Sequence, residues 1–171
     1  GAIRAARAYT GREKVFHCGY HGWHDWYIAG TTRNKGVPQG SIDLQFEFPY
    51  NDLSKLEELF DEHHGQVAAV IMEPYRSVGP DAGFLEGVKD LAHANGAILI
   101  YDEVASGFRF RLGGINEIYG VTPDIGCFGK AMGNGMPISA IVGPSEVMNI
   151  FDELFFSFTF GGECLSLAAS I

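Results

Sequence analysis

The stretch AILIYDE, residues 97–103, is an apolar run of strand length that ends in two acidic residues. A second stretch, IGCFGK at residues 125–130, ends in a lysine after another short apolar run. In open α/β sheets the carboxyl ends of the strands face the ligand crevice. The two stretches therefore predict that Asp102, Glu103 and Lys130 lie at one edge of a sheet.

Apolar runs of strand length alternate along the chain with segments of helical period, which is the pattern of a largely parallel α/β sheet. Asn51 or Asp52 can cap a helix, and Gly96 can end another. The sequence thus predicts a mostly parallel central sheet flanked by helices. The expected strands are residues 67–72, 97–101, 125–128 and 138–142, and the expected helices are residues 2–9, 53–60, 84–95 and 165–171.

The length of 171 residues predicts one domain, residues 1–171, with a substantial buried core. Because the first and last residues fall inside expected helices, we expect the chain to be part of a longer enzyme, truncated at both ends.

The chain has 12 basic and 21 acidic residues, a formal net charge of −9, and no basic stripe. This composition argues against nucleic acid or an anionic membrane surface as a partner. No apolar run is long enough to cross a bilayer, and the charged N-terminus does not resemble a signal peptide. The three cysteines form no close pair, which favours a reducing, cytoplasmic location.

Residues of these types also occur in two other kinds of site, a nucleotide-hydrolysis site and a metal site. An apolar strand ending in Asp102 and Glu103 also resembles the Walker B element of a nucleotide hydrolase, but the phosphate loop that such an enzyme needs is missing around Gly129 and Lys130. Metal-ligating residue types cluster near the N-terminus, but glycines interrupt their spacing, and we expect no metal site there. The members of that cluster are His17, Cys18, His21, His24 and Asp25.

Several longer motifs resemble the class III aminotransferases, particularly the branch of the glutamate-1-semialdehyde aminomutases. The separation of 28 residues between Asp102 and Lys130 is similar to that of the family. The resemblance extends over essentially the whole chain, and it rests on the motifs taken together. They are residues 5–12, 20–22, 73–74, 101–109, 119–125 and 129–138.

The resemblance implies the large cofactor-binding domain of a fold type I enzyme that uses pyridoxal 5′-phosphate (PLP). It implies that Lys130 is catalytic, forming a Schiff base with the cofactor and moving the proton at the substrate carbon. Asp102 is then the partner of the pyridine nitrogen. The other cofactor-binding residues that it implies are Tyr20 and Val104 against the two ring faces, His21, and Thr159 reaching the phosphate from a second subunit.

Two departures from the family pattern concern the phosphate and the substrate. Thr159 is followed by Gly161-Gly162-Glu163-Cys164 in place of a Ser-Gly-Asn-Pro continuation. Val78 stands where many ω-aminotransferases carry an acid, which argues against a standard γ-aminobutyrate or ornithine specificity. Arg76 nearby suits either an acidic substrate or a solvated loop.

The expected function is transfer of an amino group between a small-molecule amino donor and a carbonyl acceptor, in a homodimer with shared active sites. An intramolecular 1,2-aminomutase of the glutamate-1-semialdehyde type is the nearest alternative. A nucleotide hydrolase using Asp102 and Glu103, or a catalytically silent relative that only binds, are the alternatives from other classes.

Overall fold

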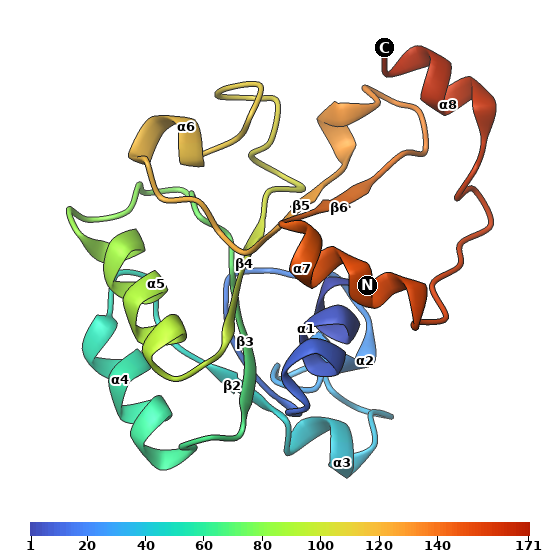
Figure 1. Cartoon of the computed structure of the whole chain (residues 1–171). Coiled ribbons are helices and arrows are strands. Elements are labelled where there is room, and N and C mark those ends of the chain that lie inside the picture. Colours follow the sequence, from blue (N-terminus) through green and yellow to red (C-terminus); the bar gives the residue numbers. More distant parts are fainter.

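The computed structural model describes residues 1–171 and contains a six-stranded sheet with helices on both faces (Figure 1). The strand order is β2-β1-β3-β4-β5-β6. The first five strands in this order are parallel, and β6 is antiparallel to β5. The strands are β1 (Lys14–Cys18), β2 (Gln45–Glu47), β3 (Val67–Met72), β4 (Ile98–Asp102), β5 (Ile125–Phe128) and β6 (Ala140–Val142).

The helices form one layer on each side of this sheet. The α-helices are α1 (Ala2–Thr10), α2 (Asp25–Ile28), α3 (Gln39–Ile42), α4 (Leu53–Glu62), α5 (Phe84–Ala94), α6 (Asn116–Tyr119), α7 (Ser145–Met148) and α8 (Cys164–Ala169). Two 3₁₀ turns, η1 (Lys130–Met132) and η2 (Asn149–Asp152), complete the elements.

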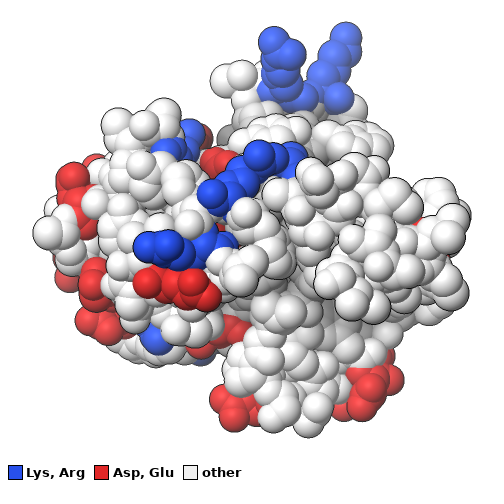
Figure 2. Space-filling model, turned by 90° about the horizontal axis from the view of Figure 1, so that it is seen from above, with Lys and Arg blue, Asp and Glu red and all other residues white.

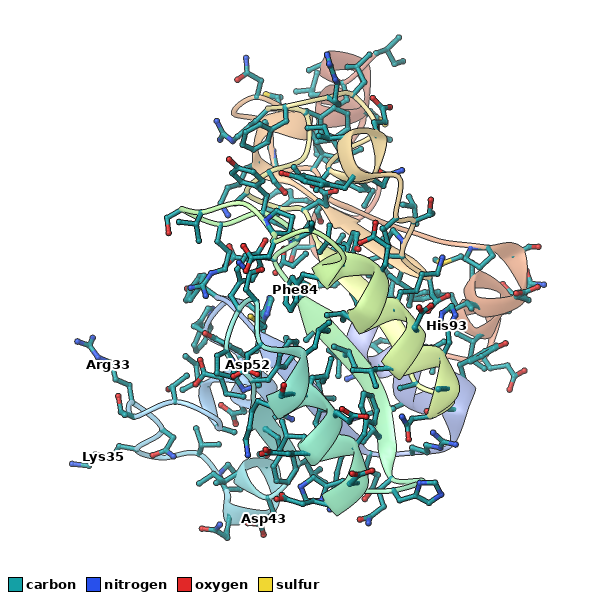
Figure 3. All side chains as sticks on the ribbon, turned by 90° about the vertical axis from the view of Figure 1, so that its left-hand side faces the viewer. Arg33, Lys35, Asp43, Asp52, Phe84 and His93 are labelled. Atoms are coloured by element: carbon teal, nitrogen blue, oxygen red, sulfur yellow. The ribbon has the colours of Figure 1, made fainter.

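Side chains alternate between the two faces of each strand, and each face packs against its own helix layer. On one face, Leu99 and Tyr101 of β4 join a core with the apolar sides of α4 and α5. On the other face, Ile98 and Ile100 join a core with α1 and α7. Figure 3 shows α4 and α5 side by side in front of the sheet, starting near the labelled Asp52 and Phe84. All six residues of β3 are buried, because this strand has a helix layer on each side.

Local signals in the sequence set the helix ends as expected. The Asp52 carboxylate accepts a hydrogen bond from the backbone N–H of Lys55 at 2.9 Å, so Asp52 is the N-cap of α4. Gly96 has a φ of +67° just after α5, the left-handed conformation that ends a helix at low cost in glycine.

The predicted fold class is confirmed, and the expected elements are present with small shifts at their ends. The strand expected over residues 138–142 is shorter, and it pairs antiparallel with β5. No strand was predicted at the positions of β1 and β2. Both are parallel members of the sheet, and β1 lies between β2 and β3.

The longest helix, α5, has 11 residues. No helix combines the length and the hydrophobicity that a bilayer crossing requires.

Two tyrosine hydroxyls on the α4–α5 side of the sheet offer a test of the packing. The Tyr101 hydroxyl is buried without a hydrogen-bond partner, whereas the Tyr50 hydroxyl donates to the Pro74 carbonyl at 2.9 Å. We expect Tyr101→Phe to raise the free energy of unfolding by up to about 1 kcal/mol, and Tyr50→Phe to lower it by about 1 kcal/mol. Urea unfolding of the complete protein measures both. An equal loss in the two variants would contradict the assignment of Tyr101 as unpaired.

Candidate active site

The candidate site lies at the carboxyl ends of the parallel strands. Asp102 ends β4 and is paired in register with Cys127 of β5, which precedes Lys130 by three residues. The backbone N–H of Glu103 donates to the Cys127 carbonyl at 2.9 Å and holds the two strand ends together. The predicted placement of the acid and the lysine at one sheet edge is therefore confirmed.

Asp102 is held from two directions. Nδ1 of His21 donates to its Oδ2 at 2.8 Å, and the backbone N–H of Val104 donates to its Oδ1 at 3.1 Å. The His21 side chain is 1% exposed and that of Asp102 is 15% exposed. Each carboxylate oxygen retains a second lone pair, so Asp102 can accept a further hydrogen bond from a ligand on its open side.

Lys130 lies on the surface of the crevice and makes no salt bridge or side-chain hydrogen bond. Its φ of +40° is in the left-handed region, which costs a residue other than glycine roughly 1–3 kcal/mol. Of the four such residues in the chain, Phe108, Lys130 and Asn134 lie in the two loops that follow β4 and β5. Strained backbone of this kind gathers at ligand sites, so these loops are candidates for a binding role.

A pocket of about 380 Å³ opens beside Lys130. Arg109, from the loop after β4, lines it together with residues 130–131 and 134–137. Arg109 was not among the predicted site residues, although it lies within the motif of residues 101–109. Asp102 and His21 are not among the lining residues, so the pocket extends the site away from the carboxylate.

Glu103 is buried and stabilises a loop, whereas Lys130 is exposed. Its buried carboxylate accepts hydrogen bonds from Ser106 Oγ and from the backbone N–H of Ile115. Burial raises the pKa of Glu103, whereas these two hydrogen bonds oppose that rise. Glu103 thus ties together the two ends of the loop that carries Arg109.

Glu73, at the end of β3, shapes the turn that carries Tyr20. Its Oε2 accepts the backbone N–H of Tyr20 at 3.0 Å. A Cβ on Gly19 would lie 2.5 Å from the same oxygen, and Gly19 has a φ of +108°, so only glycine suits this position. Arg76 points to this acid, with Nε 3.7 Å from Glu73 Oε2.

The ring-facing residues inferred from the family resemblance lie close to these groups. The Tyr20 ring is 62% exposed on the turn after β1 and packs edge-on against Tyr27, at 5.7 Å between ring centroids. Val104 follows Asp102, and its side chain is 3.6 Å from the place where a Cβ on Gly129 would stand. Both side chains are therefore near the strand ends that carry Asp102 and Lys130.

Thr159 stands apart from the other predicted site residues. It lies exposed in the segment before α8 and makes no side-chain hydrogen bond within the chain. Within one chain, the structure does not bring Thr159 to Asp102 or Lys130.

Figure 2 looks down on the strand ends and shows how unevenly charge is distributed there. Acidic and basic side chains gather on the left, whereas the right-hand part, on the side of β6 and α8, is largely free of charge apart from its rim. The C-terminal apolar patch lies on this side of the fold, and it exposes Phe155, Phe156, Phe158, Phe160, Leu165 and Leu167. In the sequence, Thr159 lies between Phe158 and Phe160 of this patch.

Comparisons with known proteins agree with this geometry. The family model for class-III aminotransferases matches residues 1–171. A 3-aminobutyryl-CoA aminotransferase from Cloacimonas acidaminovorans is 41% identical over 99% of this chain and 42% of its own length. A glutamate-1-semialdehyde 2,1-aminomutase from Lachnoclostridium phytofermentans is 41% identical over 90% of this chain and 39% of its own length.

Among solved structures, the FumI protein of Sphingopyxis sp. MTA144, described as a PLP internal aldimine form, superposes with a TM-score of 0.90. It is 29% identical over 99% of this chain and 42% of that protein. The chain thus spans less than half the length of the proteins it matches. These findings do not support the nucleotide-hydrolase alternative.

Proposed function

Because the chain belongs to the class-III aminotransferase family, we propose that the complete protein is a PLP-dependent aminotransferase. It transfers an amino group between a small-molecule amino donor and a carbonyl acceptor. The observation that carries this proposal is that Asp102, held by His21, and Lys130, which makes no ion pair, lie at the ends of adjacent strands.

The residues present fit PLP. A positive pyridine N–H requires an anionic acceptor, and Asp102 has one partly open carboxylate already fixed by two donors. An aldehyde requires an unpaired amine, and Lys130 offers one beside a pocket. Once bound, PLP supplies an electron sink for the negative charge that develops on the substrate carbon.

Each residue then has a separate role in the proposed reaction. Lys130 Nζ would bind the cofactor aldehyde with loss of water; once a substrate amine displaced it, the free amine would move the proton at the amino-bearing carbon of the substrate. Asp102 holds the proton on the ring nitrogen, and His21 orients Asp102. Tyr20 and Val104 fix the plane of the ring from its two faces.

An intramolecular aminomutase is a second candidate, because the aminomutase relative is as similar to this chain as the aminotransferase relative, at 41% identity. The two activities share the residues above and differ in the need for a separate amino donor. Product analysis with and without an added donor separates them.

We also place the protein in the cytoplasm. Its three cysteines are free, as suits a reducing compartment.

The role of Lys130 is tested by borohydride reduction of the complete protein with PLP, followed by peptide mass mapping. We expect the pyridoxyl group on Lys130, because this lysine alone lies at the strand ends beside Asp102. Lys89 and Lys55 serve as internal controls, since both are on helices of the outer layer. A label on either of them, or no label, would refute the assignment.

The role of Asp102 is tested by Asp102→Asn. A neutral amide does not stabilise a positive ring nitrogen, so we expect turnover to fall by about tenfold to a thousandfold while PLP still binds. Glu103→Gln is the matched control, because Glu103 is buried against Ser106 and Ile115 and already has a raised pKa. Steady-state kinetics measure both, and equal turnover in the two variants would remove Asp102 from the mechanism.

We further propose a homodimer in which Thr159 reaches the cofactor phosphate of the partner subunit. The resemblance of residues 157–162 to the family motif supports this, and the exposed Thr159 side chain makes no hydrogen bond within its own chain. A second copy is the occupant that would bring a hydroxyl from this segment to another site.

The shared site makes a specific demand on mixed subunits. Thr159→Val and Lys130→Ala damage different contributions to one site, so we expect each variant alone to be nearly inactive. Mixing them should restore roughly a quarter of the activity, because one of the two sites in each mixed dimer is intact and half of random dimers are mixed. Subunit exchange without any recovered activity would exclude the shared site.

A further inference from the structure

Three buried polar side chains lie next to the candidate site. Only one of them, His21, has a role in the proposed reaction. The buried polar cluster consists of His17 on β1, Gln45 on β2 and His21 after β1. His17 is 1% exposed and Gln45 is 6% exposed. The side-chain atoms without a hydrogen-bond partner are both ring nitrogens of His17, both amide atoms of Gln45, and Nε2 of His21.

These side chains are neighbours on one face of the sheet. Val15 pairs with Gln45 in the parallel register, and His17, two residues further along, points to the same side as Val15. A Cβ on Gly30 would lie 2.6 Å from His17 Nε2 and 3.3 Å from Gln45 Cβ, so Gly30 touches both. The ring centroids of His17 and His21 are 6.4 Å apart. The Tyr27 ring lies 5.3 Å from each.

The cluster connects to Asp102 through His21. Because Nδ1 of His21 donates to the Asp102 carboxylate, its Nε2 is left to accept a hydrogen bond when the ring is neutral. The tautomer of a histidine is set by the partner of its other ring nitrogen. A donor at Nε2 would therefore fix the proton on Nδ1, where Asp102 needs it.

The cluster contains the groups that can provide such a donor. Burial lowers the pKa of His17 to about 4, so His17 is neutral at pH 7 and has one donor and one acceptor. Gln45 adds two donors and one acceptor. A distance of 6.4 Å between ring centroids is long for a direct bond and suits one bridging water.

We propose that His17 and Gln45 are positioning residues that bind a buried water, which donates to Nε2 of His21 and so keeps the proton of His21 on Nδ1, facing Asp102. This hydrogen-bond relay, made of His17, Gln45, the water and His21, orients Asp102 through His21 Nδ1. His17 and Gln45 contact neither substrate nor cofactor. The benefit of the relay to catalysis rests on the proposed function, in which Asp102 holds the ring nitrogen. The hydrogen-bond relay itself does not.

The experiment observes the tautomer of His21 directly, by nitrogen-15 NMR of histidine-labelled complete protein without PLP. In the unmodified protein we expect a protonated Nδ1 and a hydrogen-bonded, unprotonated Nε2. His17→Phe removes one side of the relay and should shift the tautomer ratio of His21 by about threefold to tenfold, the equivalent of one ordinary hydrogen bond. His17→Gln restores a donor and an acceptor and should return the ratio toward that of the unmodified protein.

A glycine pair provides a second test if His17→Phe does not fold. Gly30→Ala puts a methyl group against His17 Nε2, whereas a Cβ on Gly40 meets nothing within 4 Å, and neither glycine has a positive φ. We expect Gly30→Ala to shift the His21 ratio and Gly40→Ala to leave it unchanged. An unchanged His21 ratio in a folded His17→Phe protein, or in Gly30→Ala, would overturn the proposal.

The outcome is independent of the proposed function. If borohydride fails to label Lys130 while the His21 ratio still shifts in His17→Phe, the aminotransferase proposal is wrong and the relay holds. If Lys130 is labelled while the ratio does not shift, the relay is wrong and the proposed function holds.

Discussion

The constraint on which the structure depends is the burial of both faces of β3. Every residue of this strand is buried, so the sheet must be covered by helices on both sides, and parallel strands with helical crossovers meet that requirement. The same arrangement sends the carboxyl ends of β1, β3, β4 and β5 to one edge. The candidate site therefore follows from the core: Asp102 ends β4, Lys130 is the second residue after β5, and His21 is the third residue after β1.

Much of this fold can be predicted from the sequence, because buried strands such as residues 67–72 are continuous apolar runs. The strands β1 and β2 were missed, since Lys14 and His17 interrupt the first run and Gln45 and Glu47 the second. Lys14 lies at the amino end of β1, with its Nζ 3.0 Å from His63 Nδ1, whereas His17 and Gln45 are buried near the site. The direction of β6 was also not predictable, because it depends on the path of the connection over residues 129–139 and not on any pattern within the strand.

The site residues likewise fall into those that the sequence predicted and those that it did not. Asp102 and Lys130 were predictable from strand ends, and the family resemblance agrees with their placement. The contact between His21 and Asp102 joins residues 81 positions apart, and no local pattern reports such a distance. The roles of Arg109 and Glu103 depend on the path of the loop after β4, which a single sequence does not define. Thr159 was inferred from a family motif alone, and its side chain makes no hydrogen bond within the chain that would support a role.

Two segments far apart in the sequence meet in space: Arg4 on α1 donates to the Phe155 carbonyl at 2.8 Å, across 151 positions of sequence. The apolar face of α1 also packs against Ile150, Phe151 and Leu154. A ribosome delivers α1 before these residues, so the layer under α1 stays incomplete until they emerge. The α4–α5 side, made of residues closer in sequence, can form much earlier. During translation, the apolar face of α1 is therefore exposed until residues 150–154 emerge to cover it.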